Sequence, residues 1–366
     1  MPVKILDNKI SDNKLSAITS AGYNRGKAPV FVLGCPRSGT TLLYHMLLSA
    51  GGFAVYRTES NVFNLLAPRF GGMRSESDRR QLMQYWLGSM LFRRSGLDAR
   101  QIEQSIIEEC RGPGDFLRLV MEAIAGTQNV PRWADCTPEH LLYMEEIKQQ
   151  LPDALFIHII RDARDVALSY VKQGWSHPLP WDRQEHLAVA GLYWEWMVRQ
   201  GREQGKALGL DYQEVRFEDL VDHPQGTLSQ LSEFIEQDLD PDRIRNVAIG
   251  SVSQPNSSFK DEPVKGFNPV GRWKTKLSSE EAADFELVVG DFLRELQYPV
   301  ESPKRWSLRA LRLRGTYFSL FESKRWARQN TPLRKLIQLG HIEIRTDPPP
   351  TEKLQQHQNT TDLRQA

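Results

Sequence analysis

The segment Pro29-Val30-Phe31-Val32-Leu33-Gly34-Cys35-Pro36-Arg37-Ser38-Gly39-Thr40-Thr41 decides the fold. Its first six residues are a short β-rich apolar run that ends at glycine, as is typical of a buried parallel strand. Residues 40–50 follow with apolar side chains on one helical face. A strand that turns through glycines into a helix offers backbone N–H groups and the positive end of the helix dipole to an anion. The segment therefore predicts an anion-binding loop in a parallel α/β sheet.

The spacing Gly34-x-x-x-x-Gly39-x-Thr41 is that of the nucleotide P-loop, but Thr40 stands where that loop has lysine. The cation is instead Arg37, whose planar guanidinium group suits two oxygens of a phosphate or sulfate. We expect the N–H groups of residues 38–41 to face one concavity, and Thr40 and Thr41 to add hydroxyl donors. Losing the lysine disfavours a triphosphate with magnesium, so a P-loop kinase or nucleotide hydrolase is the second choice.

Strands and helices alternate along the rest of the chain, which predicts an α/β fold with a parallel sheet covered on both faces. Strands are expected at 53–56, 132–134, 154–160 and 212–217, and helices over 60–128, 163–173, 184–208 and 278–296. Thr137 is expected to cap a helix that begins at Pro138. The predicted parts are an N-terminal extension (1–27), a main domain (28–300) with a helical insert (60–128), a basic amphipathic helical extension (301–342) and a disordered tail (343–366).

The composition limits the classes of protein. Of 366 residues, 40% are hydrophobic and 25% are charged, as in globular proteins, so wholesale disorder and fibrous folds are excluded. No apolar stretch is long enough for a transmembrane helix, and residues 1–27 lack the apolar core of a secretory signal. The three cysteines, at 35, 110 and 136, show neither disulfide pairing nor zinc-ligand spacing. A cytoplasmic protein without a metal is expected.

The C-terminal part is basic. Residues 303–366 contain thirteen of the 47 Lys and Arg residues but only five of the 46 Asp and Glu residues. Leu313, Tyr317, Leu320 and Phe321 recur at helical spacing, and arginines at 305, 309 and 312 lie on another face. This pattern predicts a basic amphipathic helix. It can dock on the acidic body or a second subunit, or lie on an anionic membrane through residues 303–340; nucleic acid is the least favoured partner.

Two motifs resemble those of sulfotransferases that use 3′-phosphoadenosine 5′-phosphosulfate (PAPS). The run Pro36-Arg37-Ser38-Gly39-Thr40-Thr41-Leu42 is similar to the family's 5′-phosphosulfate loop, most closely in tyrosylprotein sulfotransferases and bacterial members. Arg161, at a predicted strand end, and Ser169, eight residues later, resemble the 3′-phosphate motif. Since ATP lacks a 3′-phosphate, this pair separates the two nucleotides. The resemblance implies a P-loop-like three-layer sandwich and metal-free, in-line sulfonate transfer from PAPS to a hydroxyl acceptor: a carbohydrate, a lipid, or a small alcohol or phenol.

Two further segments support the resemblance, which covers about residues 28–300. Gly271-Arg272-Trp273-Lys274 resembles a late Gly-x-Trp-Lys segment that closes over the 3′-phosphate, with Arg272 and Lys274 supplying charge and Trp273 buried. Phe217-Glu218-Asp219-Leu220 resembles a Tyr-Glu-Asp-Leu segment; Phe217 lacks the tyrosine hydroxyl but can still stack on adenine. Cys136 stands before Thr-Pro, where the family offers lysine. This departure keeps open a non-catalytic nucleotide-binding scaffold.

Transfer to an alcohol needs a base near the acceptor oxygen and positive charge near the sulfonate. Glu59 lies 22 residues after Arg37 in the sequence. It follows the predicted strand 53–56, so we expect it at the same sheet edge as the Arg37 loop. The resemblance to tyrosylprotein sulfotransferases implies a catalytic Glu in a similar place. In that family the Glu lies one residue closer to the loop arginine. We therefore predict that Glu59 is the general base and that Arg37 contacts the sulfonate. His45 is the rival base, whereas His158 is predicted to be a core residue.

The acceptor side is expected to be walled by the insert 60–128 and by the loop 173–181. This loop carries Trp175 and Trp181. The two tryptophans can stack on a sugar or aromatic ring of the acceptor, or anchor the loop on the core.

Overall fold

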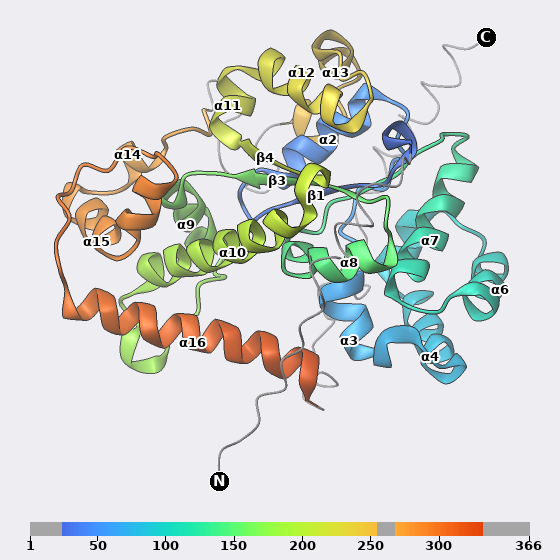
Figure 1. Ribbon diagram of the computed structural model, residues 1–366, viewed down its shortest axis with the longest axis horizontal. Helices are drawn as coiled ribbons and strands as arrows, with labels where there is room; N and C mark the ends of the chain where they lie inside the picture. Colours follow the sequence, from blue (N-terminus) through green and yellow to red (C-terminus); the bar gives the residue numbers. More distant parts are fainter. Residues whose placement is uncertain (1–23, 255–267, 332–366) are drawn as a thin grey trace.

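A four-stranded parallel sheet lies at the centre of the protein, in a computed structural model that describes residues 24–254 and 268–331 (Figure 1). The spatial order is β2-β1-β3-β4. The strands span Val30–Leu33 (β1), Ala134–Asp135 (β2), Leu155–Ile160 (β3) and Tyr212–Arg216 (β4). β1 and β3 run in register from the pair Val30–Leu155 to the pair Leu33–His158. Their carboxyl ends therefore lie side by side.

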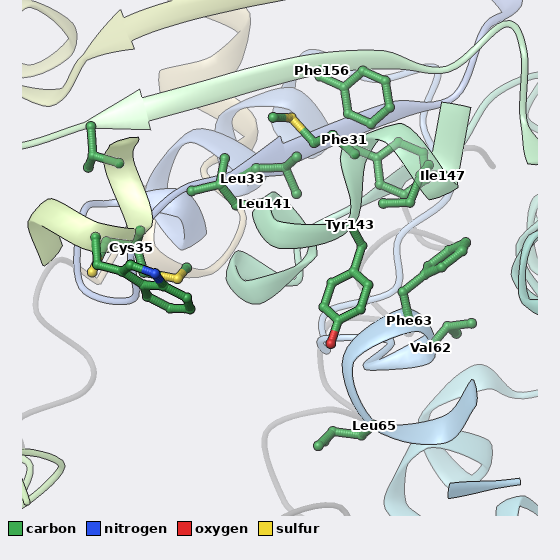
Figure 2. Packing of buried hydrophobic residues seen from close by; sticks show 14 of the residues in the cluster. Phe31, Leu33, Cys35, Val62, Phe63, Leu65, Leu141, Tyr143, Ile147 and Phe156 are labelled. Carbon is green, nitrogen blue, oxygen red and sulfur yellow. The ribbon is translucent and has the colours of Figure 1, made fainter. Parts of the chain in front are cut away.

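Alternate side chains of the two central strands enter two separate cores. Phe31, Leu33 and Phe156 join the larger core, whose packing is drawn in Figure 2, whereas Val32 and Ile157 join the smaller one. Every residue of β1 and β3 is buried. Such strands need apolar residues on both faces, which explains why His158 is the one polar residue in the two strands.

Helices cover both faces of the sheet, which confirms the expected three-layer α/β sandwich (Figure 1). The smaller core is closed by α2 (Thr40–Ala50), α11 (Phe217–Asp222), α12 (Pro224–Ile235) and α13 (Pro241–Val247). The larger core is closed by α8 (Met144–Gln150), α9 (Ala163–Lys172), α10 (His186–Leu208) and α15 (Ser279–Glu295). Ser278 and Glu281 form a capping box at the start of α15.

Residues 60–128 form the expected helical insert. It begins with a π-helical turn, η2 (Val62–Leu66), and ends with the amphipathic α7 (Pro113–Thr127). Ser75 and Asp78 form a capping box at the start of α4, and the Asp98 side chain caps α6. Between these ends lie α3 (Ala67–Arg69), η3 (Gly71–Met73), α4 (Glu76–Trp86), α5 (Met90–Ser95) and α6 (Ala99–Glu109).

The predicted strand at 53–56 is wrong. Phe53 makes only an isolated bridge to Arg132. Side chains satisfy the next backbone groups in place of a neighbouring strand: Gln128 accepts a hydrogen bond from the Val55 N–H at 2.7 Å, and the Tyr44 hydroxyl donates to the Tyr56 carbonyl at 2.7 Å. Backbone groups that already bond side chains are not available to extend the ladder.

The predicted strand at 132–134 is displaced to Ala134–Asp135. The buried Arg132 guanidinium donates to the carbonyl oxygens of Arg25, Ala28 and Ile235, and so joins three chain segments at this end of the sheet. Thr137 does not cap the next helix as expected. Its hydroxyl bonds the Asp135 carboxylate at 3.3 Å, and the following turns are the 3-10 helix η4 (Pro138–Tyr143).

The basic C-terminal helix, α16 (Leu308–Asn330), lies along α10 and α15 at one edge of the molecule (Figure 1). Leu313 and Tyr317 of its predicted apolar face are buried against the body. Arg309 pairs with Glu185 at 2.6 Å and Arg314 with Glu195 at 2.7 Å. The helix therefore docks on acidic groups of the body, the first of its predicted alternatives.

Short turns complete the described chain. They are η1 (Arg25–Lys27), η5 (Pro180–Asp182), η6 (Gly209–Asp211), η7 (Gly250–Val252) and α14 (Trp273–Lys276). None of the described helices is long and apolar enough to cross a bilayer. The predicted tail 343–366 and residues 332–342 of the predicted basic extension lie outside the described residues.

Candidate active site

The predicted anion-binding loop joins β1 to α2 and is shaped by two glycines. A Cβ atom on Gly34 would lie 2.6 Å from the Ile159 carbonyl oxygen of the neighbouring strand, so no larger residue fits there. Gly39 has φ +99°, and a Cβ atom on it would lie 2.3 Å from the Phe217 ring. Arg37 itself adopts a left-handed φ of 77°, which is costly for a residue with a side chain. Strain of this kind is concentrated at functional sites.

One part of the loop prediction is wrong. The N–H of Ser38 donates to the Cys35 carbonyl at 3.0 Å and closes the turn, so it does not face a concavity with its neighbours. The N–H groups of residues 39–41 belong to the cap and first turn of α2, where the helix itself provides no acceptor. These three N–H groups remain as the backbone donors of the loop.

The two predicted anion-binding motifs meet in the structure. The Arg37 Nε donates to the Ser169 Oγ at 2.8 Å, and the Arg161 Nη1 donates to the Arg37 carbonyl at 3.1 Å. This contact follows from topology, since the loop leaves β1 and Arg161 leaves the adjacent β3. The structure therefore brings residues from both motifs to the same edge of the sheet.

Three arginines concentrate positive charge at this edge. Burial, followed by the charges of Arg161 and Arg272, lowers the pKa of Arg37 to about 10, although Glu59 opposes the shift. Burial also lowers the pKa of Arg161, and Arg272 contributes to that shift in spite of nearby carboxylates. Among the described residues, the buried Ser38 Oγ and Arg161 Nε have no hydrogen-bond partner. An anion with several oxygens would offset the repulsion among the three arginines and would accept hydrogen bonds from these two donors.

The Phe217 ring is buried between the loop and Arg161. The Arg161 guanidinium carbon lies 4.5 Å from the ring centroid, a cation–π distance. The ring also fills the space beside Gly39. In this arrangement Phe217 supports the loop and Arg161, and its predicted stacking on adenine stays a prediction.

The late segment 271–274 is tied to the same site by Asp165, a residue that we did not single out from the sequence. Its carboxylate accepts the N–H of Gly271 at 2.8 Å and that of Trp273 at 2.9 Å. Trp273 is buried as predicted, and the Arg164 guanidinium stacks 3.7 Å from its ring centroid. Lys274 is exposed at the surface. The segment thus contacts Asp165 through its backbone, and its Arg272 adds positive charge to the site.

Arg164, three residues after Arg161, has a structural role. It is fully enclosed and pairs with Asp162 at 2.7 Å and with Glu286 of α15 at 2.7 Å. Arg161 differs, because its carboxylate partner Asp165 lies at 3.6 Å and also holds the segment 271–274. Of the two arginines in this motif, only Arg161 reaches the loop.

Glu59 lies near the loop, although the strand that was expected to place it is absent from the structure. Enclosure by the protein, followed by the negative charges of Glu139 and Asp135, raises its pKa to about 7, and Arg37 opposes the shift. The residue nevertheless keeps an exposed surface, so a second reactant can reach it. A carboxyl group with a pKa close to neutrality is suited to accept a proton.

The backbone around Glu59 is held by a buried polar network. The Asn61 side chain donates to the Glu59 carbonyl at 3.2 Å, and the Asn61 N–H donates to the Thr137 hydroxyl at 3.3 Å. Thr137 in turn bonds Asp135, whose other oxygen lies 2.9 Å from His140 Nδ1. His140 Nε2 accepts the Phe63 N–H, so Nδ1 carries the proton of the neutral ring. The network was not recognised from sequence, because its members lie some 75 residues apart.

The rival reactive groups are placed less favourably. His45 Nδ1 accepts the Ser251 N–H at 3.0 Å, and burial lowers the pKa of His45 to about 4. His158 is a core residue, as predicted. Cys136 is buried beside Thr40, and burial raises the pKa of its thiol. Within residues 24–254 and 268–331, no three His, Cys, Asp or Glu side chains are grouped to hold a metal ion.

Aromatic side chains border the site on the predicted acceptor side. Trp175 lies 5.8 Å from the Arg37 guanidinium carbon and packs edge-on against Tyr170. Both Trp175 and Trp181 are exposed, so neither is an anchor buried in the core. The insert also borders a cavity of about 700 Å³ between Phe63, Tyr143 and Arg328. Whether an acceptor uses these surfaces stays a prediction.

The chain is similar to one protein family and to several known proteins. The model of the sulfotransferase family matches residues 29–241. Protein-tyrosine sulfotransferase A of Caenorhabditis elegans is 23% identical over 309 residues, which cover 80% of this chain and 73% of the relative. The sulfotransferase domain of the Synechococcus PCC 7002 olefin synthase is 16% identical with a TM-score of 0.48, covering 79% of this chain and 94% of that one. Retinol dehydratase, solved with androsterone and inactive cofactor PAP, is 14% identical with a TM-score of 0.38, covering 80% and 86%.

Proposed function

Since the chain belongs to the sulfotransferase family, we propose that it transfers the sulfonate group of PAPS to a hydroxyl group of an acceptor. The observation that carries the proposal is the contact between the Arg37 loop and the Arg161–Ser169 pair. An ATP site needs only the first of these motifs. A donor with phosphate groups at both the 5′ and the 3′ positions would use both.

The residues at the site fit such a donor. Arg37, Ser38 and the N–H groups of Gly39, Thr40 and Thr41 would hold the 5′-phosphosulfate, and the unused Ser38 hydroxyl supports this assignment. Arg161 and Ser169 would hold the 3′-phosphate, with the unused Arg161 Nε as an available donor. The cofactor site would be completed by Phe217 and by Gly271, Arg272, Trp273 and Lys274.

PAPS supplies an activated sulfonate group when it is bound. Glu59 takes the proton of the acceptor hydroxyl, because its raised pKa makes it a base at neutral pH. Arg37 offsets the negative charge that develops on the sulfonate oxygens and the departing phosphate. Cys136 stands where the family offers lysine, so one expected positive charge is missing near the sulfonate. Arg272 provides positive charge nearby, since its charge contributes to the lowered pKa of Arg37.

Calorimetric titration with adenosine 3′,5′-bisphosphate and with ATP–magnesium tests the donor assignment. We expect the bisphosphate to bind at least tenfold more tightly, since a hydrogen bond to a charged group contributes about 1.5–3 kcal/mol. Tighter binding of ATP–magnesium would favour a kinase or nucleotide hydrolase. Binding of the bisphosphate without transfer to any acceptor would favour the nucleotide-binding scaffold.

The acceptor is a hydroxyl compound among carbohydrates, lipids, and small alcohols or phenols. Incubating cell extract with isotopically labelled PAPS and following the label by mass spectrometry identifies it. A labelled product that the Arg37→Ala variant fails to form would establish the activity and its acceptor together.

A further inference from the structure

The outer side of α16 and its surroundings hold an unusual concentration of exposed apolar side chains. Of the nine large hydrophobic side chains that are exposed among the described residues, five lie on this helix, in the segment before it or in η5. We call these five residues the outer patch: Trp181, Trp306, Leu308, Leu311 and Trp326. Isolated apolar residues are common on protein surfaces, but a concentration of this kind marks an interaction site.

The outer patch does not overlap the face of α16 that packs on the body. Leu308 and Trp326 are 18 residues apart, which is five turns at about 100° per residue, so they share one side of the helix. Leu311 is about 60° from them, whereas the buried Tyr317 is about 180° away. The apolar face that the sequence suggested for a membrane is therefore used inside the protein, and a different face is presented outward.

Trp181 is fixed beside the helix by its neighbours in η5. Asp182 accepts a hydrogen bond from Arg312 at 2.7 Å and another from the Tyr317 hydroxyl at 3.1 Å. The Tyr317 hydroxyl also accepts the Leu179 N–H at 2.8 Å. Trp181 is 71% exposed in spite of these contacts on both sides. The loop is thus held while its tryptophan faces water.

Positive charge surrounds the first half of the outer patch. Lys304 keeps 75% of its side chain exposed, and Arg312 keeps 48% although it pairs with Asp182. Arg305 lies beside Trp306 in the segment that leads into the helix and is exposed as well. The carboxylates that pair with these cations are Asp182, which is buried beneath Arg312, and Asp291, which is exposed and lies 3.2 Å from Lys304. Three basic side chains therefore stand beside two acidic ones, and only one of the acidic ones is exposed.

We propose that the outer patch binds the interface of an anionic lipid bilayer. Tryptophan is suited to the headgroup region, where its apolar body and polar N–H are both satisfied. Basic residues next to it are attracted by anionic lipids. A helix lying in the membrane plane uses this combination without spanning the bilayer. A symmetric dimer through the same patch would instead bring two copies of the basic group Lys304, Arg305 and Arg312 into one interface.

Vesicle sedimentation with the full chain tests this proposal. The probes are vesicles of phosphatidylcholine alone and of phosphatidylcholine mixed with phosphatidylglycerol. We expect binding to the anionic vesicles, and a loss of at least about tenfold in the triple variant Trp306→Ser, Leu308→Ser, Leu311→Ser, because each side chain is solvent-exposed in the protein and buried in the lipid. The matched control is Leu210→Ser with Val247→Ser, exposed apolar residues on other elements, which should bind like the wild type.

A second variant separates the electrostatic part. Lys304→Gln with Arg305→Gln removes two exposed charges and should weaken binding to anionic vesicles by about 25-fold, at about 1 kcal/mol for each charge. The proposal is overturned if the wild-type chain ignores anionic vesicles or if the triple variant binds them equally well. A dimer in light scattering that the triple variant abolishes, without vesicle binding, would assign the patch to a second copy. Vesicle binding requires neither PAPS nor acceptor, so its failure leaves the proposed reaction untouched.

Discussion

Replacing Glu59 by glutamine tests the proposed base directly. The amide keeps the shape of the carboxyl group but cannot accept the proton of the acceptor hydroxyl. We expect kcat to fall by about 10²–10⁴-fold, the usual contribution of a positioned base, while the affinity for adenosine 3′,5′-bisphosphate stays nearly unchanged.

The pH profile gives this prediction its magnitude from the structure. With a pKa of about 7 for Glu59, about nine tenths of the enzyme would hold a protonated base at pH 6. The rate should therefore fall about tenfold for each pH unit below 7 and level off above it. This acidic limb of the pH profile should disappear in Glu59→Gln. Because the Glu139 charge raises the pKa of Glu59, Glu139→Gln should move the limb to lower pH.

Initial rates with saturating PAPS across pH 5–9 measure both effects, once an acceptor is known. His45→Asn is the control and should leave the limb in place, since burial already lowers the pKa of His45 to about 4. The reasoning is refuted if the limb survives in Glu59→Gln, or if His45→Asn removes it. The donor site would stand in either case.

Other substitutions test the donor site and its frame. Arg37→Ala should abolish transfer and keep the circular dichroism spectrum of the wild type; near-normal turnover would contradict the loop assignment. Arg161→Ala should weaken binding of the 3′-phosphorylated donor by about ten- to a hundredfold more than that of its 3′-dephospho analogue, measured by calorimetry. Gly39→Ala should lower the unfolding free energy by about 2–4 kcal/mol in urea titrations, from a left-handed φ and a clash with Phe217; an unchanged midpoint would show that the ring moves aside. Asp165→Ala should weaken bisphosphate binding about tenfold by releasing the segment 271–274, and unaltered affinity would remove that segment from the site.

The sequence predicted the central part of the fold because that part depends on local pattern. β1 is a continuous apolar run, β3 is one interrupted by His158, and the loop after β1 has glycines at fixed positions. The segment 53–56 failed for the opposite reason. Its residues favour a strand, but its backbone groups are taken by Tyr44 and by Gln128, which is 73 residues away from Val55.

The same distinction holds for the site. Arg37, Arg161 and Ser169 could be brought together from sequence, since adjacent parallel strands end at one edge. Asp165 was not singled out, because its role depends on Gly271, 106 residues later. The outward-facing Trp326 of α16 could not be assigned either, because the stronger apolar stripe of the same helix was the one that the body buried.

The sheet also determines how the protein behaves at high concentration. One edge is β2, only two residues long, with the Gln128 side chain occupying the backbone of the neighbouring segment. The other edge, β4, carries Glu214 in an ion pair with Arg202 at 2.9 Å. Short or charged edges give another chain little free backbone on which to add a strand. Overexpressed native protein should therefore resist strand-to-strand aggregation, and precipitation should arise from chains whose strands have not yet docked.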